Sequence, residues 1–528
     1  MNNKLCDVAI LAGGKGTRLK SRTGNVPKPM ALLLGKPILE HQIELCKKQG
    51  FLNIALLVCY EHEFISEYFK DGLKFGVNIT YVIENQPRGT AGALSDALDI
   101  FSDNFLVLYG DTYLDVDLNL FLDFHFKVKS EISLMIHPND HPVDSDLVEI
   151  NDKSRVIDIH PYPHPLNTYL PNLVNAALYV INRNIFKGEV PTSGKFDLAK
   201  HTFPDLICKG VKVFGYVSQE YIKDMGTPER IDKVERDIIF GLPEMLSTRQ
   251  FRSAIFLDRD GTINEEINHL SKPEQLRLIK GAGHAIRKIN RKGFLSVVIT
   301  NQPVIARGDL TLDGLKKIHN KLHFELALSG AYLDKIYICP HHPDNGFPNE
   351  IPELKIACNC RKPKTGLIDQ AVKELKIDRT KSWFIGDTSS DMLAANNAGL
   401  KTVLVRTGYA GYDLKYNIKP DFILPDIDNA VDFIFNDYFM LKEKLKPIVS
   451  LSSESRLILI GGLARVGKSF MAQVLAELLM QIGKKVHVIS IDGWLKPIET
   501  RDEGKGVLNR YNMSEVQKII KLCIDNPS

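Results

Sequence analysis

One sequence pattern, which occurs three times along this 528-residue chain, constrains its fold more than any other feature. A short apolar run ends abruptly in a glycine- or aspartate-rich turn, and a stretch with the spacing of an amphipathic helix follows. The three runs are Val8–Leu11, Ala254–Leu257 and Leu457–Ile460. Open parallel sheets place their ligand sites at the carboxyl ends of such strands. The sequence therefore predicts an α/β protein with three doubly wound, mostly parallel sheets and three sites.

Segments between these units mark the expected domain boundaries. A charged helical stretch ends in Gly241-Leu242-Pro243, and the segment from 426 to 455 becomes mostly polar towards its end. We place the domains at residues 1–241, 250–425 and 453–528. A hydrophobic fraction of 44% is enough to give each domain its own core.

Composition argues against several classes of protein. The chain has 67 Lys+Arg against 64 Asp+Glu, a net charge of +3, which argues against a nucleic-acid partner. Its apolar runs are far shorter than the ~18–20 residues that span a bilayer, and the N-terminus lacks a signal-peptide pattern. Eight cysteines are too sparse for a disulfide scaffold. We therefore expect a cytoplasmic protein without a membrane partner, while the oligomeric state stays open.

The first turn has the features of a phosphate-binding loop. Glycines at 13, 14 and 16 let the backbone approach a triphosphate closely, and Arg18 offers a fork of donors for phosphate oxygens. Lys28 stands between two prolines and can neutralise charge on a transferring phosphate. Further along, Asp111 follows an apolar run, and Asp224 precedes Gly226-Thr227-Pro228.

This ordered set, over about residues 5–240, resembles the sugar-1-phosphate nucleotidyltransferases, and residues 111–118 are most similar to the heptose 1-phosphate or mannose 1-phosphate guanylyltransferases. The resemblance implies that a sugar 1-phosphate attacks the α-phosphorus of an NTP, giving an NDP-sugar and pyrophosphate. It also implies roles for individual residues: phosphate binding by Gly13, Gly14, Gly16 and Arg18, transition-state stabilisation by Lys28, base contacts by Gly89 and Thr90, a sugar contact by Asn175, and Mg²⁺ binding by Asp111 and Asp224.

One segment departs from this family. Where the family has Glu-Lys-Pro, with a lysine that holds the sugar phosphate, this chain reads Asp158-Ile159-His160-Pro161. The way in which the sugar phosphate is bound is therefore left open.

The second turn carries two carboxylates, Asp258 and Asp260, directly after an apolar run. A carboxylate can attack phosphorus when a cation neutralises it, and a second acid can protonate the leaving oxygen. With Thr300, Lys362 and Asp387 downstream, residues 252–410 resemble the haloacid-dehalogenase-like phosphatases. The resemblance implies a nucleophile that becomes an aspartyl-phosphate (Asp258), a general acid/base (Asp260), a Mg²⁺ site (Asp258, Asp260 and Asp387) and phosphate or substrate contacts (Thr300, Asn301, Arg361 and Lys362).

Three cysteines and one histidine between these motifs predict a metal site. Cys339, His341, Cys358 and Cys360 offer four soft or borderline ligands, which suit a closed, structural, tetrahedral zinc site. His342 is the rival imidazole, but the similar zinc-loop phosphatases have Cys-x-His, which favours His341.

Zinc-loop phosphatases include heptose 1,7-bisphosphate phosphatases and histidinol phosphatases. This chain is more similar to the heptose enzymes, because Ile305–Gly308 follows Thr300-Asn301-Gln302 as it does in them. Pro303-Val304 departs from the pattern of those enzymes. Removing the 7-phosphate of D-glycero-D-manno-heptose 1,7-bisphosphate would leave a 1-phosphate for the first domain. We therefore expect a multifunctional enzyme of nucleotide-activated heptose synthesis, with GTP favoured. Two alternatives stay open: a hexose 1-phosphate nucleotidyltransferase with a histidinol-phosphatase-like domain, and a nucleotide-binding scaffold without turnover.

The third turn is a complete phosphate-loop motif, which runs from Gly462 to Ser469 and includes Gly467 and Lys468. A second expected strand, Val486–Ile491, ends in Asp492, which resembles the uridine-kinase and phosphoribulokinase group. The remaining residues are too few for such a kinase. We expect either part of a longer protein or an incomplete kinase that only binds nucleotide.

Overall fold

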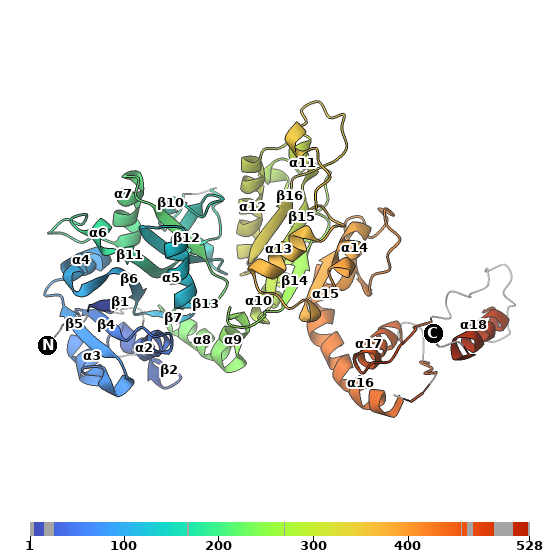
Figure 1. Cartoon of the computed structure of the whole chain (residues 1–528), viewed down its shortest axis with the longest axis horizontal. Coiled ribbons are helices and arrows are strands. Elements are labelled where there is room, and N and C mark those ends of the chain that lie inside the picture. Colours follow the sequence, from blue (N-terminus) through green and yellow to red (C-terminus); the bar gives the residue numbers. More distant parts are fainter. Residues whose placement is uncertain are drawn as a thin grey trace. The chain divides into compact units, whose positions relative to one another are not determined.

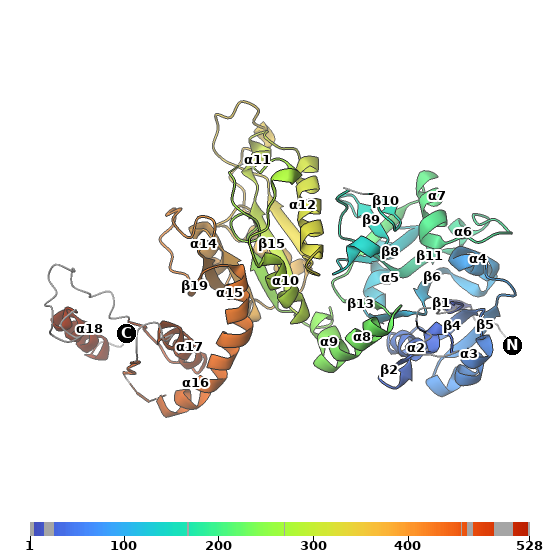
Figure 2. The same cartoon turned by 180° about the vertical axis from the view of Figure 1, so that it is seen from behind.

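A computed structural model describes residues 5–14, 19, 26–165, 168–268, 270–452, 454–455, 457–461, 468–489 and 511–525 (Figures 1 and 2). The chain forms two units, Met1–Pro420 with Pro425–Asp428, and Asp421–Leu424 with Asn429–Ser528. Helices and sheets alternate in the first unit, so the predicted α/β class is confirmed. None of the helices among the described residues is long and apolar enough to cross a membrane.

The first sheet is mixed. Its main path runs β10-β9-β11-β6-β1-β4-β5, and β8 pairs with both β11 and β12. The strands β1, β4, β5 and β6 are parallel to one another, whereas β11 runs antiparallel to β6, β8 and β9. Their bounds are β1 Cys6–Leu11, β4 Asn53–Val58, β5 Asn78–Ile83, β6 Phe101–Tyr109, β8 Ile132–His137, β9 Leu147–Ile150, β10 Val156–His160, β11 Val174–Asn182 and β12 Val213–Val217.

Both faces of this sheet are covered, which explains why its central strands are apolar throughout. Side chains of β1 alternate between the faces. Val8 and Ile10 belong to one buried cluster with residues of α2 (Ile38–Lys48), α3 (His62–Phe69) and α5 (Leu118–Lys127). Ala9 belongs to another with residues of α4 (Gly89–Asp96) and α7 (Phe203–Cys208).

The second sheet follows the predicted parallel pattern. Within the first unit its strands lie in the order β16-β15-β14-β17-β18, and each neighbouring pair is parallel. Helices α10 and α12 lie on one face, and α13 and α14 on the other (Figures 1 and 2). The bounds are β14 Ala254–Leu257, α10 Ala282–Arg291, β15 Leu295–Asn301, α12 Leu312–Ala327, β16 Lys335–Cys339, α13 Gly366–Glu374, β17 Trp383–Gly386, α14 Ser389–Asn397 and β18 Lys401–Val405.

The strand order of the second sheet positions its site. The chain moves outwards from β14 to β16 and then returns to the other side of β14 with β17. A reversal of this kind leaves a crevice at the carboxyl ends of the two adjacent strands. Asp258 follows β14 and Asp387 follows β17, so both predicted carboxylates stand at this crevice.

In the second unit, the described residues from 429 onwards are largely helical, in α16 (Phe439–Ser452), α17 (Lys468–Gln481) and α18 (Met513–Asp525). Helices α16 and α17 pack together, and Lys442 Nζ lies 3.2 Å from Glu477 Oε1. The expected strand Leu457–Ile460 is not formed, and residues 486–489 of the expected strand Val486–Ile491 are also outside any strand. A β-strand needs a partner for its backbone groups, and these described residues pair with none.

Candidate active sites

The carboxyl ends of β1 and β6 form the floor of the first site. Gly110, after β6, donates its N–H to the carbonyl of Leu11 at 3.0 Å. A Cβ on Gly110 would lie 3.1 Å from that oxygen, so a larger residue would push the two strand ends apart. This contact places Asp111, the next residue, at the same edge of the sheet as the end of β1, after which the predicted phosphate loop begins.

A two-stranded ribbon brings the second predicted metal ligand to the same place. Strand β7 (Thr112–Asp115) pairs antiparallel with β13 (Tyr221–Asp224), and Asp224 lies opposite Thr112. Lys28, at the start of η2 (Lys28–Met30), forms an ion pair with Asp111, and its Nζ lies 3.6 Å from Asp224 Oδ1. The structure thus brings together three residues that are far apart in sequence.

The residues predicted to contact the base begin α4. Gly89 has a φ of +78°, and a Cβ there would lie 2.4 Å from the carbonyl oxygen of Phe196. Thr90 Oγ1 donates to Asp197 Oδ2 at 3.0 Å and accepts from the N–H of Leu198 at 2.9 Å. Only glycine fits at position 89, because the backbone of Phe196 occupies the space that a Cβ would need. The sequence reasoning did not identify this segment.

Other predictions for this site have mixed outcomes. Asn175 donates to the hydroxyl of Tyr179 at 3.0 Å and accepts from the N–H of Ala177 at 3.1 Å, so its predicted sugar contact stays a prediction. Gly16 and Arg18 lie outside the described residues.

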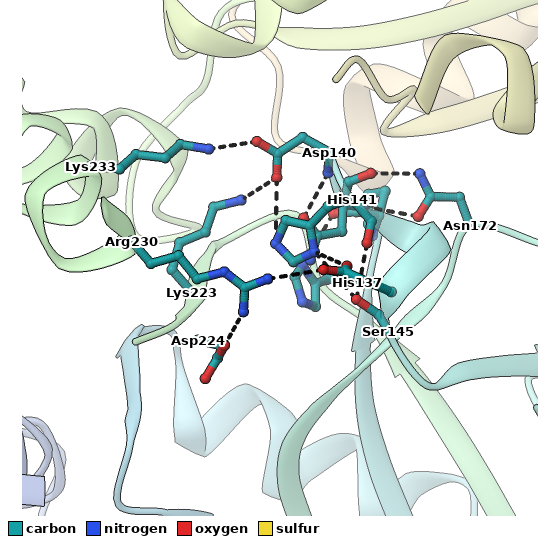
Figure 3. A network of polar contacts seen from close by, with 12 residues as sticks. His137, Asp140, His141, Ser145, Asn172, Lys223, Asp224, Arg230 and Lys233 are labelled. Atoms are coloured by element: carbon teal, nitrogen blue, oxygen red, sulfur yellow. Dashed lines mark hydrogen bonds and ion pairs between the residues drawn. The ribbon is translucent and has the colours of Figure 1, made fainter. Parts of the chain in front are cut away.

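The sequence did not predict a polar network that lies next to Asp224 (Figure 3). Arg230 forms ion pairs with Asp224 and with Asp144, the latter at 3.2 Å. Asp140 meets Lys223 at 3.0 Å and Lys233 at 2.5 Å. Burial alone would raise the pKa of Asp140, but the two lysines outweigh it and hold this pKa well below its usual value.

In the second site, one lysine stands between two carboxylates. Lys362 Nζ lies 2.8 Å from Asp258 Oδ1 and 2.6 Å from Asp391 Oδ1, and it donates to the carbonyl of Ile299 at 2.8 Å. Asn301, at the end of β15, accepts from the backbone N–H of Lys362 at 3.0 Å and so fixes the lysine's position.

The carboxylates of this site converge as a cation site would require. Oxygens of Asp258, Asp387 and Asp391 all lie within 4.8 Å of one another. Burial and the neighbouring carboxylates raise the pKa of Asp258 to about 7 and that of Asp387 to about 9. A buried cluster of oxygen donors that repel one another is suited to Mg²⁺, which would neutralise them without protonation.

Asp391, which was not among the predicted ligands, joins Asp258 and Asp387 in this cluster, and Mg²⁺ binding by Asp260 stays a prediction. Asp391 lies in the first turn of α14, whose N-cap Thr388 donates to it at 2.7 Å. The carboxylate of Asp260 instead meets Arg259 at 2.8 Å, Asn264 at 2.9 Å and Gln302 at 3.0 Å. Burial would raise the pKa of Asp260, but Arg259 outweighs it and the pKa is lowered.

The remaining predicted contact residues line the same region. Thr300 Oγ1 accepts from Gln302 at 2.9 Å. Arg361 donates to the carbonyl of His341 at 3.2 Å, which links the residue before Lys362 to the cysteine cluster.

The four predicted metal ligands lie together. Cys360 Sγ is 3.2 Å from the sulfurs of both Cys339 and Cys358, and 3.1 Å from His341 Nδ1. Two sulfurs bound to one zinc at ~2.3 Å would lie about 3.8 Å apart, so the cluster is slightly contracted around one central point. His342 lies outside the cluster and contacts Arg307 and Asp344.

Comparisons with known proteins relate the chain to two families. The nucleotidyl transferase family matches residues 8–239, and the HAD-hydrolase-like family matches residues 359–430. D-glycero-beta-D-manno-heptose-1,7-bisphosphate 7-phosphatase of Haemophilus ducreyi is 38% identical over 35% of this chain and 98% of its own length. Mannose-1-phosphate guanylyltransferase of Mycobacterium tuberculosis is 31% identical over 47% of this chain and 68% of its own length. The chain belongs to both of these families.

A solved structure of HddC from Yersinia pseudotuberculosis is also similar, with 28% identity and a TM-score of 0.39 over 44% of this chain and 100% of that one. The family matches and the two curated relatives confirm, at the level of family, the predicted fusion of a nucleotidyltransferase domain with a phosphatase domain.

The third predicted site lies largely outside the described residues. This holds for Gly462, Gly467 and Asp492, and for the side chain of Ser469. Lys468 begins α17. Nucleotide binding by this segment stays a prediction beside the two enzyme domains.

Proposed function

We propose that the chain is a bifunctional enzyme of nucleotide-activated heptose synthesis. Its phosphatase domain would remove the 7-phosphate of D-glycero-D-manno-heptose 1,7-bisphosphate, and its nucleotidyltransferase domain would join the resulting 1-phosphate to an NTP, with GTP favoured. The observation that carries this proposal is the presence on one chain of two families whose reactions fit in sequence.

For the phosphatase, we assign the nucleophile to Asp258. Its carboxylate would attack the phosphorus, the bond to the sugar oxygen would break, and an aspartyl-phosphate would form. Asp260 would protonate the leaving oxygen and later take a proton from the attacking water, which releases phosphate. Because Arg259 holds Asp260 ionised, the structure favours its base role, and the acid role requires substrate to displace that ion pair.

Cations would neutralise the reacting charges in this domain. Lys362 and a Mg²⁺ held by Asp258, Asp387 and Asp391 would offset the negative charges of the nucleophile and the phosphoryl group. We assign contacts with the phosphoryl group to Thr300 and Lys362.

For the nucleotidyltransferase, we propose direct transfer without a covalent intermediate. An oxygen of the sugar 1-phosphate would attack the α-phosphorus and pyrophosphate would leave, while Lys28 stabilises the transition-state charge. Asp111 and Asp224 would hold Mg²⁺, which would supply further charge neutralisation. The ion pairs of Lys28 with both carboxylates support this assignment.

Zinc at Cys339, His341, Cys358 and Cys360 would be structural, and these reduced thiols suit a cytoplasmic location. We place the domains at residues 1–241 and 250–425, and propose nucleotide binding for residues 453–528.

The two half-reactions test the proposal separately. The protein with Mg²⁺ is incubated with the heptose bisphosphate, and phosphate release is measured. It is then given either heptose 1-phosphate or mannose 1-phosphate with each NTP, and pyrophosphate is measured. We expect activity in both assays and a preference for the heptose. A preference for mannose 1-phosphate would favour the hexose alternative that the mannose-1-phosphate relative suggests.

A further inference from the structure

We propose that Arg230 binds the phosphate of the sugar 1-phosphate, an inference that rests on the proposed function of the nucleotidyltransferase domain. Joining two phosphates requires cations for each of them, because both carry negative charge. Residues 158–161 contain no lysine, and their His160 lies 3.4 Å from Glu149 and 3.7 Å from Asp158. This segment therefore offers a phosphate an imidazole flanked by carboxylates, which is a poor site for an anion.

Arg230 stands directly at the transfer site. It lies in the first turn of α8 (Pro228–Phe240), after the N-cap Thr227. Its Nη1 meets Asp224 Oδ2, while Lys28 Nζ lies 3.6 Å from Asp224 Oδ1. Two cations from different elements thus approach the two oxygens of one carboxylate. The side chain of Arg230 is 29% exposed and that of Lys28 is 11% exposed, so Arg230 is the more open to an incoming ligand.

A second carboxylate, that of Asp144, also contacts Arg230. Arg230 Nη2 lies 3.2 Å from Asp144 Oδ2, and His141 Nδ1 lies 3.1 Å from Asp144 Oδ1. The loop that carries Asp144 is itself fixed, because Asn172 donates to the carbonyl of Asn139 at 2.8 Å. The guanidinium therefore keeps one anchor even when Asp224 is engaged elsewhere.

The two lysines of the same network are committed to a different partner. Lys223 is half-buried and lies 3.0 Å from Asp140, and Lys233 lies 2.5 Å from the other oxygen of Asp140. Their positive charges are therefore offset by the carboxylate of Asp140. Among the cations drawn in Figure 3, Arg230 is the one that contacts Asp224.

Asp224 is also one of the two carboxylates that would hold Mg²⁺ in the proposed function, so a metal ion there would compete with Arg230 for its oxygens. Arginine has five N–H donors in a planar fork that matches two phosphate oxygens, so Arg230 can keep Asp144 and still bind a phosphate. Lys28 faces the transferring phosphate in the proposed mechanism, which leaves the sugar phosphate for Arg230.

Steady-state kinetics of the full chain with Mg²⁺, GTP and heptose 1-phosphate test this inference. For Arg230→Gln we expect the KM for the sugar 1-phosphate to rise about 10- to 100-fold, which corresponds to the loss of a charged hydrogen-bonded contact, while the KM for GTP changes less than about twofold. Arg230→Lys keeps the charge without the fork and should fall between wild type and Arg230→Gln. The matched control is Arg236→Gln, an exposed arginine of the same helix, which should behave as wild type.

Each other outcome overturns the inference. An Arg230→Gln enzyme with the KM values of the Arg236→Gln control would show that Arg230 does not meet the sugar phosphate. A rise in the KM for GTP instead would place Arg230 on the nucleotide. Turnover of no sugar 1-phosphate by the wild-type protein would contradict the proposed function as well as this inference.

Discussion

Lys362 Nζ lies 2.8 Å from Asp258 Oδ1 and 2.6 Å from Asp391 Oδ1, so a single ammonium joins the proposed nucleophile to a carboxylate of α14. The side chain of Lys362 is only 3% exposed. Burial lowers its pKa, but the two carboxylates outweigh this effect and raise the pKa above its usual value. Lys362 is thus a permanent cation, and it can neutralise the charge of Asp258 during attack on phosphorus.

The first prediction concerns Asp258. Asp258→Asn removes the attacking carboxylate with little change in volume, so phosphate release from the heptose bisphosphate should fall by at least about 10³-fold. Nucleotidyl transfer from supplied heptose 1-phosphate should persist, because that site is built on another sheet. The control is Asp313→Asn, an exposed aspartate of the same domain. Loss of both activities in Asp258→Asn would contradict the separation of the sites.

The second prediction is that Mg²⁺ binding to the phosphatase site weakens as the pH falls. The pKa of Asp258 is raised to about 7 and that of Asp387 to about 9, so near neutral pH these groups hold protons that the metal must displace. Lowering the pH from 8 to 6 should therefore reduce the affinity by about tenfold per pH unit through Asp387, and by about tenfold in total through Asp258, whose pKa lies within this range. Calorimetric titration of the phosphatase site with Mg²⁺ at both pH values measures this. An affinity independent of pH would show that the carboxylates are ionised without metal.

The third prediction concerns the cysteine cluster. Cys358→Ser should lower the zinc content, and it should increase proteolytic cleavage within residues 342–357, because the cluster ties the two ends of this segment together. Metal analysis and limited proteolysis give the two readouts. Cys208→Ser, at an exposed cysteine, is the matched control. If wild type carries less than about half an equivalent of zinc, the assignment of zinc fails.

The fourth prediction links stability to pH through His125 of α5. This side chain is 1% exposed, and burial lowers its pKa to about 4. Because the folded-state pKa lies below the unfolded value of ~6.5, the neutral histidine contributes stability that is present above pH ~6.5 and lost as the pH falls towards 4. With these two pKa values, the loss at pH 5 amounts to about 2 kcal/mol.

His125→Gln should therefore flatten the dependence of Tm on pH between 7 and 5. Glutamine keeps a donor and an acceptor for Ser133 and Asn104, the present partners of His125. His62→Gln, a more exposed histidine of the same domain, serves as the control. Equal slopes for His125→Gln and the control would show that protonation of His125 does not cause the loss.

The sequence predicted residues that directly follow strands better than residues whose position depends on packing. Asp111, Asp258 and Asp387 follow β-strands, so their convergence with a neighbouring strand end could be foreseen. Asp391 and Arg230 lie in the first turns of helices, and their partners come from other elements. No local pattern encodes such pairs, because the approach of a helix to a loop depends on the packed core.

The sequence also could not predict the direction in which a side chain points. The spacing of Asp258 and Asp260 indicated a catalytic pair, yet only the structure shows Asp260 turned towards Arg259 and Gln302. Likewise, the apolar run Leu457–Ile460 has the composition of a strand, but strand formation requires neighbours that the described residues do not supply.

The central claim is that one chain converts a heptose bisphosphate into a nucleotide-activated heptose. The direct measurement is a single incubation of wild-type protein with D-glycero-D-manno-heptose 1,7-bisphosphate, Mg²⁺ and GTP, followed by mass spectrometry of the products. The account predicts GDP-heptose that lacks the 7-phosphate, together with phosphate and pyrophosphate. Repetition with the other NTPs tests the base. Absence of any NDP-heptose with every NTP would contradict the account.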